Sequence, residues 1–269
     1  MAQILVTQDR TRDGANGGTF ATVILSNPGK LNAINAAMWQ NLRSTFEALS
    51  AQEELRCVIV RGADGNFAAG ADIEEFPILR STVAQGIHYH EEIIAPALHA
   101  IAACLHPTIA AIDGVCVGGG LEIACACDLR IAAPTARFGI PINRLGFPLA
   151  PRELSGLLRL IGKARTLEIL LEGRVFEAAE ALDKGLLTRL ADDVHVAAAE
   201  AAQRVARGAP LAARANKQWI RRLAPEVATL NEQLSEQELQ AAFAYLSSND
   251  YREGVASFIA KRAPTFQGN

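Results

Sequence analysis

The chain has 269 residues, of which 50% are hydrophobic, and this is enough apolar material to bury a sizeable core. Its formal net charge of −3 leaves no overall positive field that would attract nucleic acid or an anionic membrane surface. We therefore expect a folded protein that binds neither nucleic acid nor membrane.

The five cysteines lie in apolar runs and form none of the CxxC pairs that zinc or redox sites use. This pattern predicts small core side chains in a reducing compartment, hence a cytoplasmic protein without a metal site. The first residues lack a basic start followed by an apolar run, so we expect no signal peptide. Two histidines and two prolines interrupt the longest stretch without Asp, Glu, Lys or Arg, which argues against a membrane span.

Short strand-like runs alternate with amphipathic segments, which is typical of an α/β architecture. Strands are expected at residues 19–28, 55–62, 107–114, 128–134 and 185–190. Helices are expected at residues 35–52, 74–92 with helical sequence on to about 104, from about 119, at 163–173 and 177–185, and throughout the Ala-rich tail after residue 195. We place a loose boundary near residue 200, between a core of residues 1–200 and a helical region of residues 201–269.

The stretch VCVGGGLEIACACD combines three consecutive glycines with Glu122 in apolar surroundings. Glycines at a strand-to-helix junction let another molecule approach the backbone, and a helix amino terminus offers unpaired N–H groups. Gly119 would start the helix, with Glu122 one turn later on the same side. This segment predicts an oxyanion-binding N–H beside a carboxylate that acts as a general base. The bare backbone of NFAAGAD, residues 66–72, is the expected source of a second N–H.

Structural interpretations of the same residues stay open at this point. The three glycines could serve close helix–sheet packing, with Glu122 paired to an arginine such as Arg130. The run HYHEE, residues 88–92, does not have the spacing of a zinc motif, and we expect it to form a solvated helix face that could border a pocket.

These residues resemble the crotonase (enoyl-CoA hydratase/isomerase) superfamily nearly from end to end. The similar segments are NPGKLNAIN, NFAAGADI, HPTIAAIDGVCVGGGLEIACACDLRIAAPTARFGIP, LEGRVFEAAEALDKGLL and DYREGVASFIAKRAPTF. The resemblance implies a spiral of ββα repeats with a C-terminal helical trimerisation region, and a homotrimer or homohexamer.

The resemblance also implies that the amides of Ala69 and Gly119 bind the thioester oxygen of an acyl-CoA, beside Glu122. It implies a CoA site at Lys30, Leu31, Ala33, Ala68, Asp72 and Ile73, reached by Phe258 and Lys261 from the terminal helix. For Lys30 and Lys261, an exposed lysine is almost as good an interpretation. No cofactor is expected, since coenzyme A is part of the substrate.

One departure from the family pattern bears on the chemistry. Hydratases of this family have a second glutamate after the proline of FGxPE, whereas this chain has FGIPI, with Ile142 at that position. Losing one member of an acid–base set lowers rates about 100- to 10,000-fold. Glu153 could substitute as the second acid and Arg144 could orient water or bind a substrate carboxylate, although an exposed Arg144–Glu153 pair is the plainer expectation.

The leading hypothesis is an enoyl-CoA hydratase-type lyase in which Glu122 activates water or moves the proton. The main alternative is an enoyl-CoA isomerase, because a single carboxylate can shuttle a proton between two carbons. Thioester hydrolysis and decarboxylation use the same enolate stabilisation. A catalytically weak acyl-CoA-binding protein is the non-enzymatic alternative.

Overall fold

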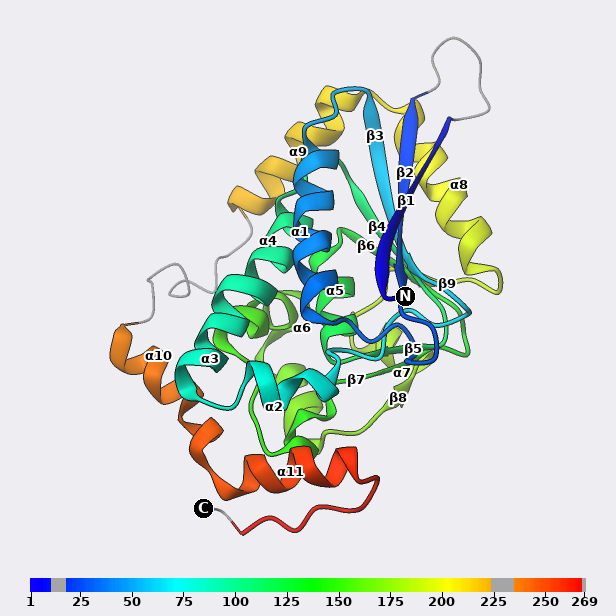
Figure 1. Ribbon diagram of the computed structural model, residues 1–269. Helices are drawn as coiled ribbons and strands as arrows, with labels where there is room; N and C mark the ends of the chain where they lie inside the picture. Colours follow the sequence, from blue (N-terminus) through cyan, green and yellow to red (C-terminus); the bar gives the residue numbers. More distant parts are fainter. Residues whose placement is uncertain (11–17, 224–234, 268–269) are drawn as a thin grey trace.

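A computed structural model describes residues 1–10, 18–223 and 235–267, and it is built around two sheets (Figure 1). The larger sheet has the strand order β1-β2-β3-β4-β6-β9, in which only the β1–β2 pair is antiparallel. The smaller sheet has the order β5-β7-β8. The strands are β1 (Gln3–Arg10), β2 (Thr19–Ser26), β3 (Leu55–Gly62), β4 (Thr108–Ile112), β5 (Val115–Val117), β6 (Leu129–Ala132), β7 (Arg137–Gly139), β8 (Phe176–Glu177) and β9 (Arg189–Leu190).

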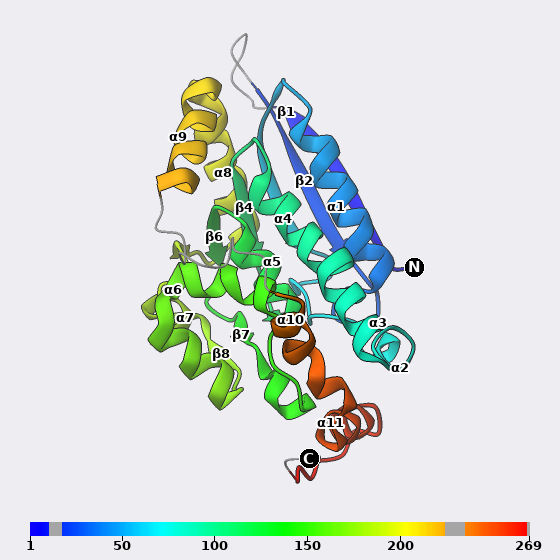
Figure 2. The ribbon, with the colours of Figure 1, turned by 90° about the vertical axis from the view of Figure 1, so that its left-hand side faces the viewer.

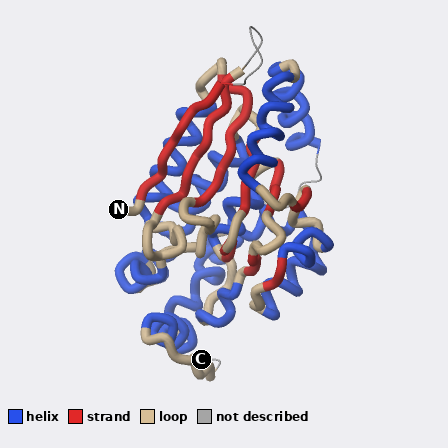
Figure 3. The backbone as a smooth tube through the Cα atoms, turned by 90° about the vertical axis from the view of Figure 1, so that its right-hand side faces the viewer, coloured by secondary structure: helices blue, strands red, loops and turns tan. Residues whose placement is uncertain are grey.

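Helices cover both faces of the larger sheet, and the C-terminal helices form one end of the molecule (Figures 2 and 3). The α-helices are α1 (Ala36–Ser50), α2 (Phe76–Leu79), α3 (Val83–His88), α4 (Ala95–Ala103), α5 (Gly119–Ala126), α6 (Pro151–Glu172), α7 (Ala178–Asp183), α8 (Val194–Arg207), α9 (Pro210–Leu223), α10 (Glu236–Phe243) and α11 (Asn249–Ile259). Shorter turns are 3-10 helical at Ile73–Glu75, Pro141–Leu145 and Ala244–Ser247, and π-helical at Tyr89–Ile94.

The alternation of side chains along β3 divides the core into two parts. Val58 and Val60 point into the larger cluster beneath α1 and α4, whereas Cys57 and Ile59 point into the cluster beneath α8. Because the middle of β3 is buried on both faces, its residues 57–60 form a continuous apolar run. Helix α1 begins at the N-cap Asn35, whose side chain accepts a hydrogen bond from the Met38 amide.

The predicted α/β architecture is confirmed, and the strands and helices expected up to residue 62 and from residue 107 to about 134 lie close to their predicted ranges. The helix expected at residues 163–173 is the second part of α6, which begins twelve residues earlier at Pro151 and is interrupted at Gly162. Of the strand expected at residues 185–190, only Arg189–Leu190 is a strand. The prediction of one helix over residues 74–92 is wrong. That segment breaks into a 3-10 turn, α2, α3 and a π-helical turn, with Thr82 capping α3. The four free cysteines other than Cys125 are buried, as expected of core side chains.

A boundary at residue 200 would cut through α8. The buried alanines of this helix, Ala198, Ala201 and Ala202, pack on the sheet face that includes Ile59. Helix α8 therefore belongs to the core. The described residues beyond it are helical in α9, α10 and α11, as expected of the C-terminal region.

Candidate active site

The two glycine-containing loops meet in space, because the end of the β3 loop pairs with β5. Ala68 forms a parallel bridge to Cys116, in which the Ala68 amide donates to the Val115 carbonyl at 2.9 Å. In return, the Val117 amide donates to the Ala68 carbonyl at 3.1 Å. This pairing places residues 69–71 beside the amino terminus of α5, as the sequence predicts.

Glycine is required at this junction by both space and conformation. Gly70 and Gly118 have φ values of +93° and +50°, where side chains are strained. A Cβ on Gly120 would lie 2.4 Å from the Ala68 carbonyl oxygen, and one on Gly119 would lie 2.9 Å from the Trp39 ring. The close-packing interpretation is therefore correct for Gly119 and Gly120, whereas Gly118 is needed for its backbone conformation. The same packing brings the two loops together.

Two backbone amides, those of Ala71 and Gly119, lie close together at this junction. Gly119 is the first residue of α5, and the first N–H groups of a helix have no acceptor within it. The Ala71 nitrogen lies 3.5 Å from the position that a Cβ on Gly119 would occupy. Ala71 and Ile34 form a parallel β-bridge, in which the hydrogen bonds are made by the residues on either side of Ala71. The Ile34 amide donates to the Gly70 carbonyl, and the Asp72 amide donates to the Ile34 carbonyl. In this pattern, the N–H of Ala71 itself points away from Ile34.

The amide of Ala69 does not have this freedom, because it donates to the Leu31 carbonyl at 2.9 Å. Ala69 is therefore not free to be the donor expected from the family resemblance, and Ala71 is the candidate donor that lies beside Gly119. The predicted donor is two residues too early for a physical reason. A loop of small residues indicates that its backbone is accessible, but it does not indicate which N–H lacks an acceptor.

Glu122 lies on the first turn of α5 and is buried. Burial, and then the nearby charge of Glu153, raise the pKa of its carboxyl well above the usual range, while Arg80 acts in the opposite direction. Arg130, considered as a structural partner of Glu122, instead donates to the carbonyls of Leu186 and Cys127. Glu122 is thus a buried acid without the arginine pair expected of a purely structural residue.

Glu153 provides a second buried carboxyl, from the first turn of α6. Its Oε1 lies 2.6 Å from Nδ1 of His90, and both side chains are no more than 5% exposed. Burial raises the pKa of Glu153 to about 8, although Arg80 lowers it. The expected exposed pair of Arg144 and Glu153 is wrong, because Arg144 is exposed while Glu153 is buried against His90.

Ile142 lies in the 3-10 turn before α6, 9% exposed and within the main hydrophobic cluster. The position of the missing hydratase glutamate is thus filled by packed hydrocarbon. The acidic group whose charge raises the pKa of Glu122 is instead the carboxyl of Glu153, eleven residues later in the sequence.

Arg80 supplies a buried positive charge near both carboxyls. Its guanidinium contacts the rings of Phe76 and Phe147, at 4.2 and 4.4 Å from their centroids, and its Nη2 donates to the Tyr245 hydroxyl at 2.6 Å. Aromatic faces attract a cation, and they do so more strongly when water is excluded. The sequence gives no signal for this arrangement, because its members come from residues 76, 80, 147 and 245.

The residues expected to bind CoA are only partly available for it. Ala68 is fully buried with both backbone groups bonded, so it does not present itself to a ligand. Lys30 Nζ pairs with Asp72 and Glu74 at 2.7 Å each, and this pairing raises the pKa of Lys30. Leu31 is 51% exposed and Phe258, on α11, is 54% exposed. Ala33, Ile73 and Lys261 remain predictions.

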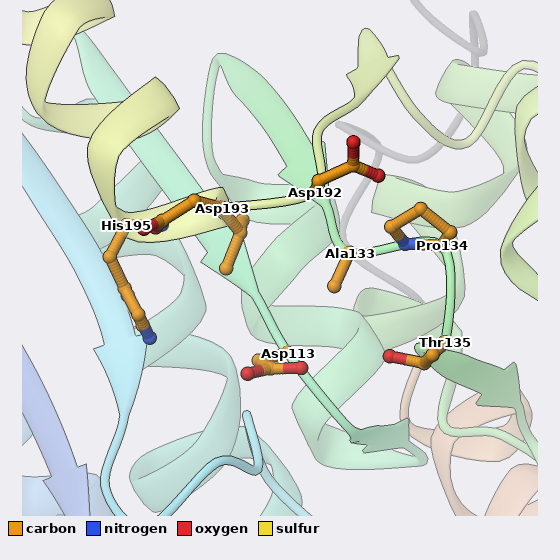
Figure 4. A pocket seen from close by; sticks show the side chains of 8 residues that line it. Asp113, Ala133, Pro134, Thr135, Asp192, Asp193 and His195 are labelled. Carbon is orange, nitrogen blue, oxygen red and sulfur yellow. The ribbon is translucent and has the colours of Figure 1, made fainter.

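A surface hollow of about 560 Å³ lies elsewhere, between the β4–β5 turn and the start of α8 (Figure 4). Two of its acids serve the backbone: Asp113 accepts from the Gly114 amide, and Asp193 caps α8. In the parts of the chain that the structure describes, no cluster of three metal-ligating side chains occurs, and no helix there is long and apolar enough to cross a membrane.

Comparison with known proteins agrees with this geometry. The sequence profile of the enoyl-CoA hydratase/isomerase family matches residues 16–269. The probable enoyl-CoA hydratase of Mycobacterium tuberculosis is 37% identical over 247 residues, covering 91% of this chain and 93% of that protein. The mevalonyl-coenzyme A hydratase of Aspergillus fumigatus is 31% identical and covers 90% of this chain and 89% of that protein.

Solved structures show the same fold. An enoyl-CoA hydratase/carnithine racemase from Magnetospirillum magneticum is 44% identical with a TM-score of 0.75, covering 94% of this chain and 93% of that one. A methylmalonyl-CoA decarboxylase with bound 2-nitronate-propionyl-CoA is 26% identical with a TM-score of 0.83, covering 97% and 98%. The fold and the paired glycine loops are those of a crotonase-type protein. The chain belongs to the enoyl-CoA hydratase/isomerase family.

Proposed function

We propose that the protein hydrates an enoyl-CoA thioester, using Glu122 and Glu153 as its acid–base pair. The observation that carries this proposal is the presence of two buried carboxyls, on the first turns of α5 and α6, with raised pKa values. Glu153 lies near enough for its charge to raise the pKa of Glu122. Hydration needs one group that takes a proton from water and one that delivers a proton to the α carbon. Buried carboxyls with raised pKa values suit both tasks, and the two protons are lost from the pair rather than from either residue alone.

The amides of Ala71 and Gly119 would hold the thioester oxygen as negative charge develops on it. Preorganised N–H donors in a water-excluded site stabilise such an enolate without reorganisation, and removing one donor typically slows a reaction about 100- to 1,000-fold. The base removes a proton from water as its oxygen attacks the β carbon, and the resulting enolate takes a proton at the α carbon.

The acyl-CoA substrate rests on the family and on the names of its members, while the CoA contacts rest on the resemblance. Lys30, Leu31, Ala33 and Ile73 are proposed to line the CoA site. Phe258 and Lys261 are proposed to reach that site within a homotrimer or homohexamer. The exposed apolar side chains of α9, Leu211, Trp219, Ile220 and Leu223, are consistent with association of subunits.

The test is loss of enoyl absorbance with crotonyl-CoA and with longer and branched enoyl-CoAs. We expect Glu122→Gln and Glu153→Gln each to lower kcat about 100- to 10,000-fold. The control is Glu200→Gln on the exposed face of α8, which should not change the rate. If Glu153→Gln retains wild-type hydration, the two-carboxyl proposal fails. If the wild type only moves the double bond of a 3-enoyl-CoA, the isomerase alternative is correct.

A further inference from the structure

His90 is a buried polar residue beside the site to which the proposed reaction gives no task. Its side chain is 5% exposed, its ring lies against those of Tyr89 and Phe243, and its Nδ1 lies 2.6 Å from Glu153 Oε1. Its Nε2 has no hydrogen-bond partner among the described groups. The imidazole is therefore committed to a single polar contact, the carboxyl of Glu153.

The local backbone explains why His90 points inward. Residues Tyr89–Ile94 form one π-helical turn between α3 and α4, and an extra residue in a turn changes which side chains face the core. Tyr89, His90, Ile93 and Ile94 are buried on this turn. The expectation of a solvated face for residues 88–92 is wrong for Tyr89 and His90 for this reason.

The π-helical turn is joined to the start of α6 by two adjacent side-chain pairs. His90 contacts Glu153, and Glu91 accepts from Arg152 Nη1 at 3.1 Å. Two consecutive residues on one element thus hold two consecutive residues on the other. The N-cap of α6, Ala150, has no side-chain cap, so the contacts from the π-helical turn help to fix the first turn on which Glu153 stands.

We propose that His90 is the positioning residue of Glu153: its neutral ring donates the Nδ1 hydrogen to Oε1, leaving Oε2 to exchange protons with substrate and water. This inference rests on the proposed role of Glu153. The ring is neutral because burial and the charge of Arg80 hold the pKa of His90 well below its usual value. Donation to the ionised carboxylate favours that form, so losing it raises the pKa of Glu153.

Other charged and titratable groups also act on Glu153 and stay constant in the comparison. Arg80 lowers its pKa and Glu91 raises it. Glu122 on α5 and the hydroxyls of Tyr89 and Tyr245 lie near enough to interact with its charge, and Arg152 is its neighbour in the sequence. A substitution at residue 90 changes one of these influences and leaves the others in place.

Two amide substitutions separate positioning from packing. In His90→Asn, the side-chain amide can take the position of Nδ1, whereas in His90→Gln it falls near the position of Nε2. The matched control is His106→Gln, because His106 is also a fully buried histidine but lies outside the site. Each variant is first checked for folding by circular dichroism and for wild-type oligomeric state.

The first measurement is the pH dependence of kcat for hydration, using the inflection that Glu153→Gln abolishes. We expect His90→Gln to move this inflection upward by about one pH unit and to lower kcat about 10- to 100-fold. His90→Asn and His106→Gln should keep the inflection within about 0.3 unit of wild type. If His90→Gln leaves the inflection unmoved, or if His90→Asn moves it equally, the positioning role is refuted.

A second measurement does not depend on turnover. Titration of the enzyme labelled with ¹³C at glutamate side-chain carboxyls, with the Glu153 signal assigned by its loss in Glu153→Gln, reports the same pKa directly. An unshifted signal in His90→Gln refutes the inference even if hydration proceeds. If the wild type hydrates no enoyl-CoA but the signal shifts upward, the proposed function fails while the His90–Glu153 contact stands.

Discussion

Replacing Glu153 with glutamine should change how the stability of the protein depends on pH. The folded protein raises the pKa of this carboxyl from about 4.5 to about 8, so folding favours its protonated form. The stability that this preference provides is fully present below pH 4.5 and is lost as the pH rises through 8. Between these two values the unfolded chain is ionised at residue 153 while the folded protein is not. At about 1.4 kcal/mol per pKa unit, the stability that Glu153 contributes therefore falls by about 3 kcal/mol between roughly pH 5.5 and pH 9.

The assay is guanidinium chloride unfolding at several pH values and one fixed protein concentration, because association makes apparent stability depend on concentration. Wild type should lose about 3 kcal/mol more than Glu153→Gln across this pH range. Glu200→Gln, an exposed substitution on α8, should keep the wild-type slope. Equal slopes for wild type and Glu153→Gln would refute the account of Glu153 as a carboxyl that folding holds in its protonated form.

Three further predictions concern the surroundings of the carboxyls. Gly120→Ala should lower kcat at least 100-fold without unfolding the protein, because its Cβ would meet the Ala68 carbonyl and separate the two amides; steady-state kinetics with a melting curve test this. Ile142→Glu should not increase hydration and should destabilise the fold by several kcal/mol, since it buries a further carboxyl in hydrocarbon; kinetics and chemical unfolding measure both effects. Lys217→Met should lower stability by about 1–3 kcal/mol, because it leaves Asp128 without its 2.6 Å partner; chemical unfolding measures the loss, and unchanged kcat is expected.

The sequence was sufficient for those parts of the fold that follow regular periodicity and local chemistry. The apolar run of β3 and the Asn35-capped helix α1 can be read from neighbouring residues alone. The junction of Gly119 and Glu122 is likewise local, since both stand on one turn of α5. The spiral of ββα repeats was predicted from the family resemblance and not from these local patterns.

The other members of the site depend on contacts between distant segments. His90 turns inward through a π-helical turn, which a helical period of 3.6 residues does not predict. Arg80 is covered in part by Phe147 and Tyr245, which lie far along the chain. The choice of Ala71 over Ala69 depends on the hydrogen bond that the Ala69 amide donates to the Leu31 carbonyl, which no pattern within residues 66–72 contains.

The charges in this pocket explain how Glu153 could replace a glutamate at position 142. A single buried cation, Arg80, acts on both Glu122 and Glu153, while His90 is neutral. Ionising both carboxyls would leave an excess negative charge in apolar surroundings, and protonating both would leave the guanidinium without a counter-ion. In the proposed reaction the two carboxyls share one proton, so that one acts as the acid while the other acts as the base. A third carboxyl at position 142 would upset this balance, and the packed side chain of Ile142 is therefore the consistent partner of an acid supplied by α6.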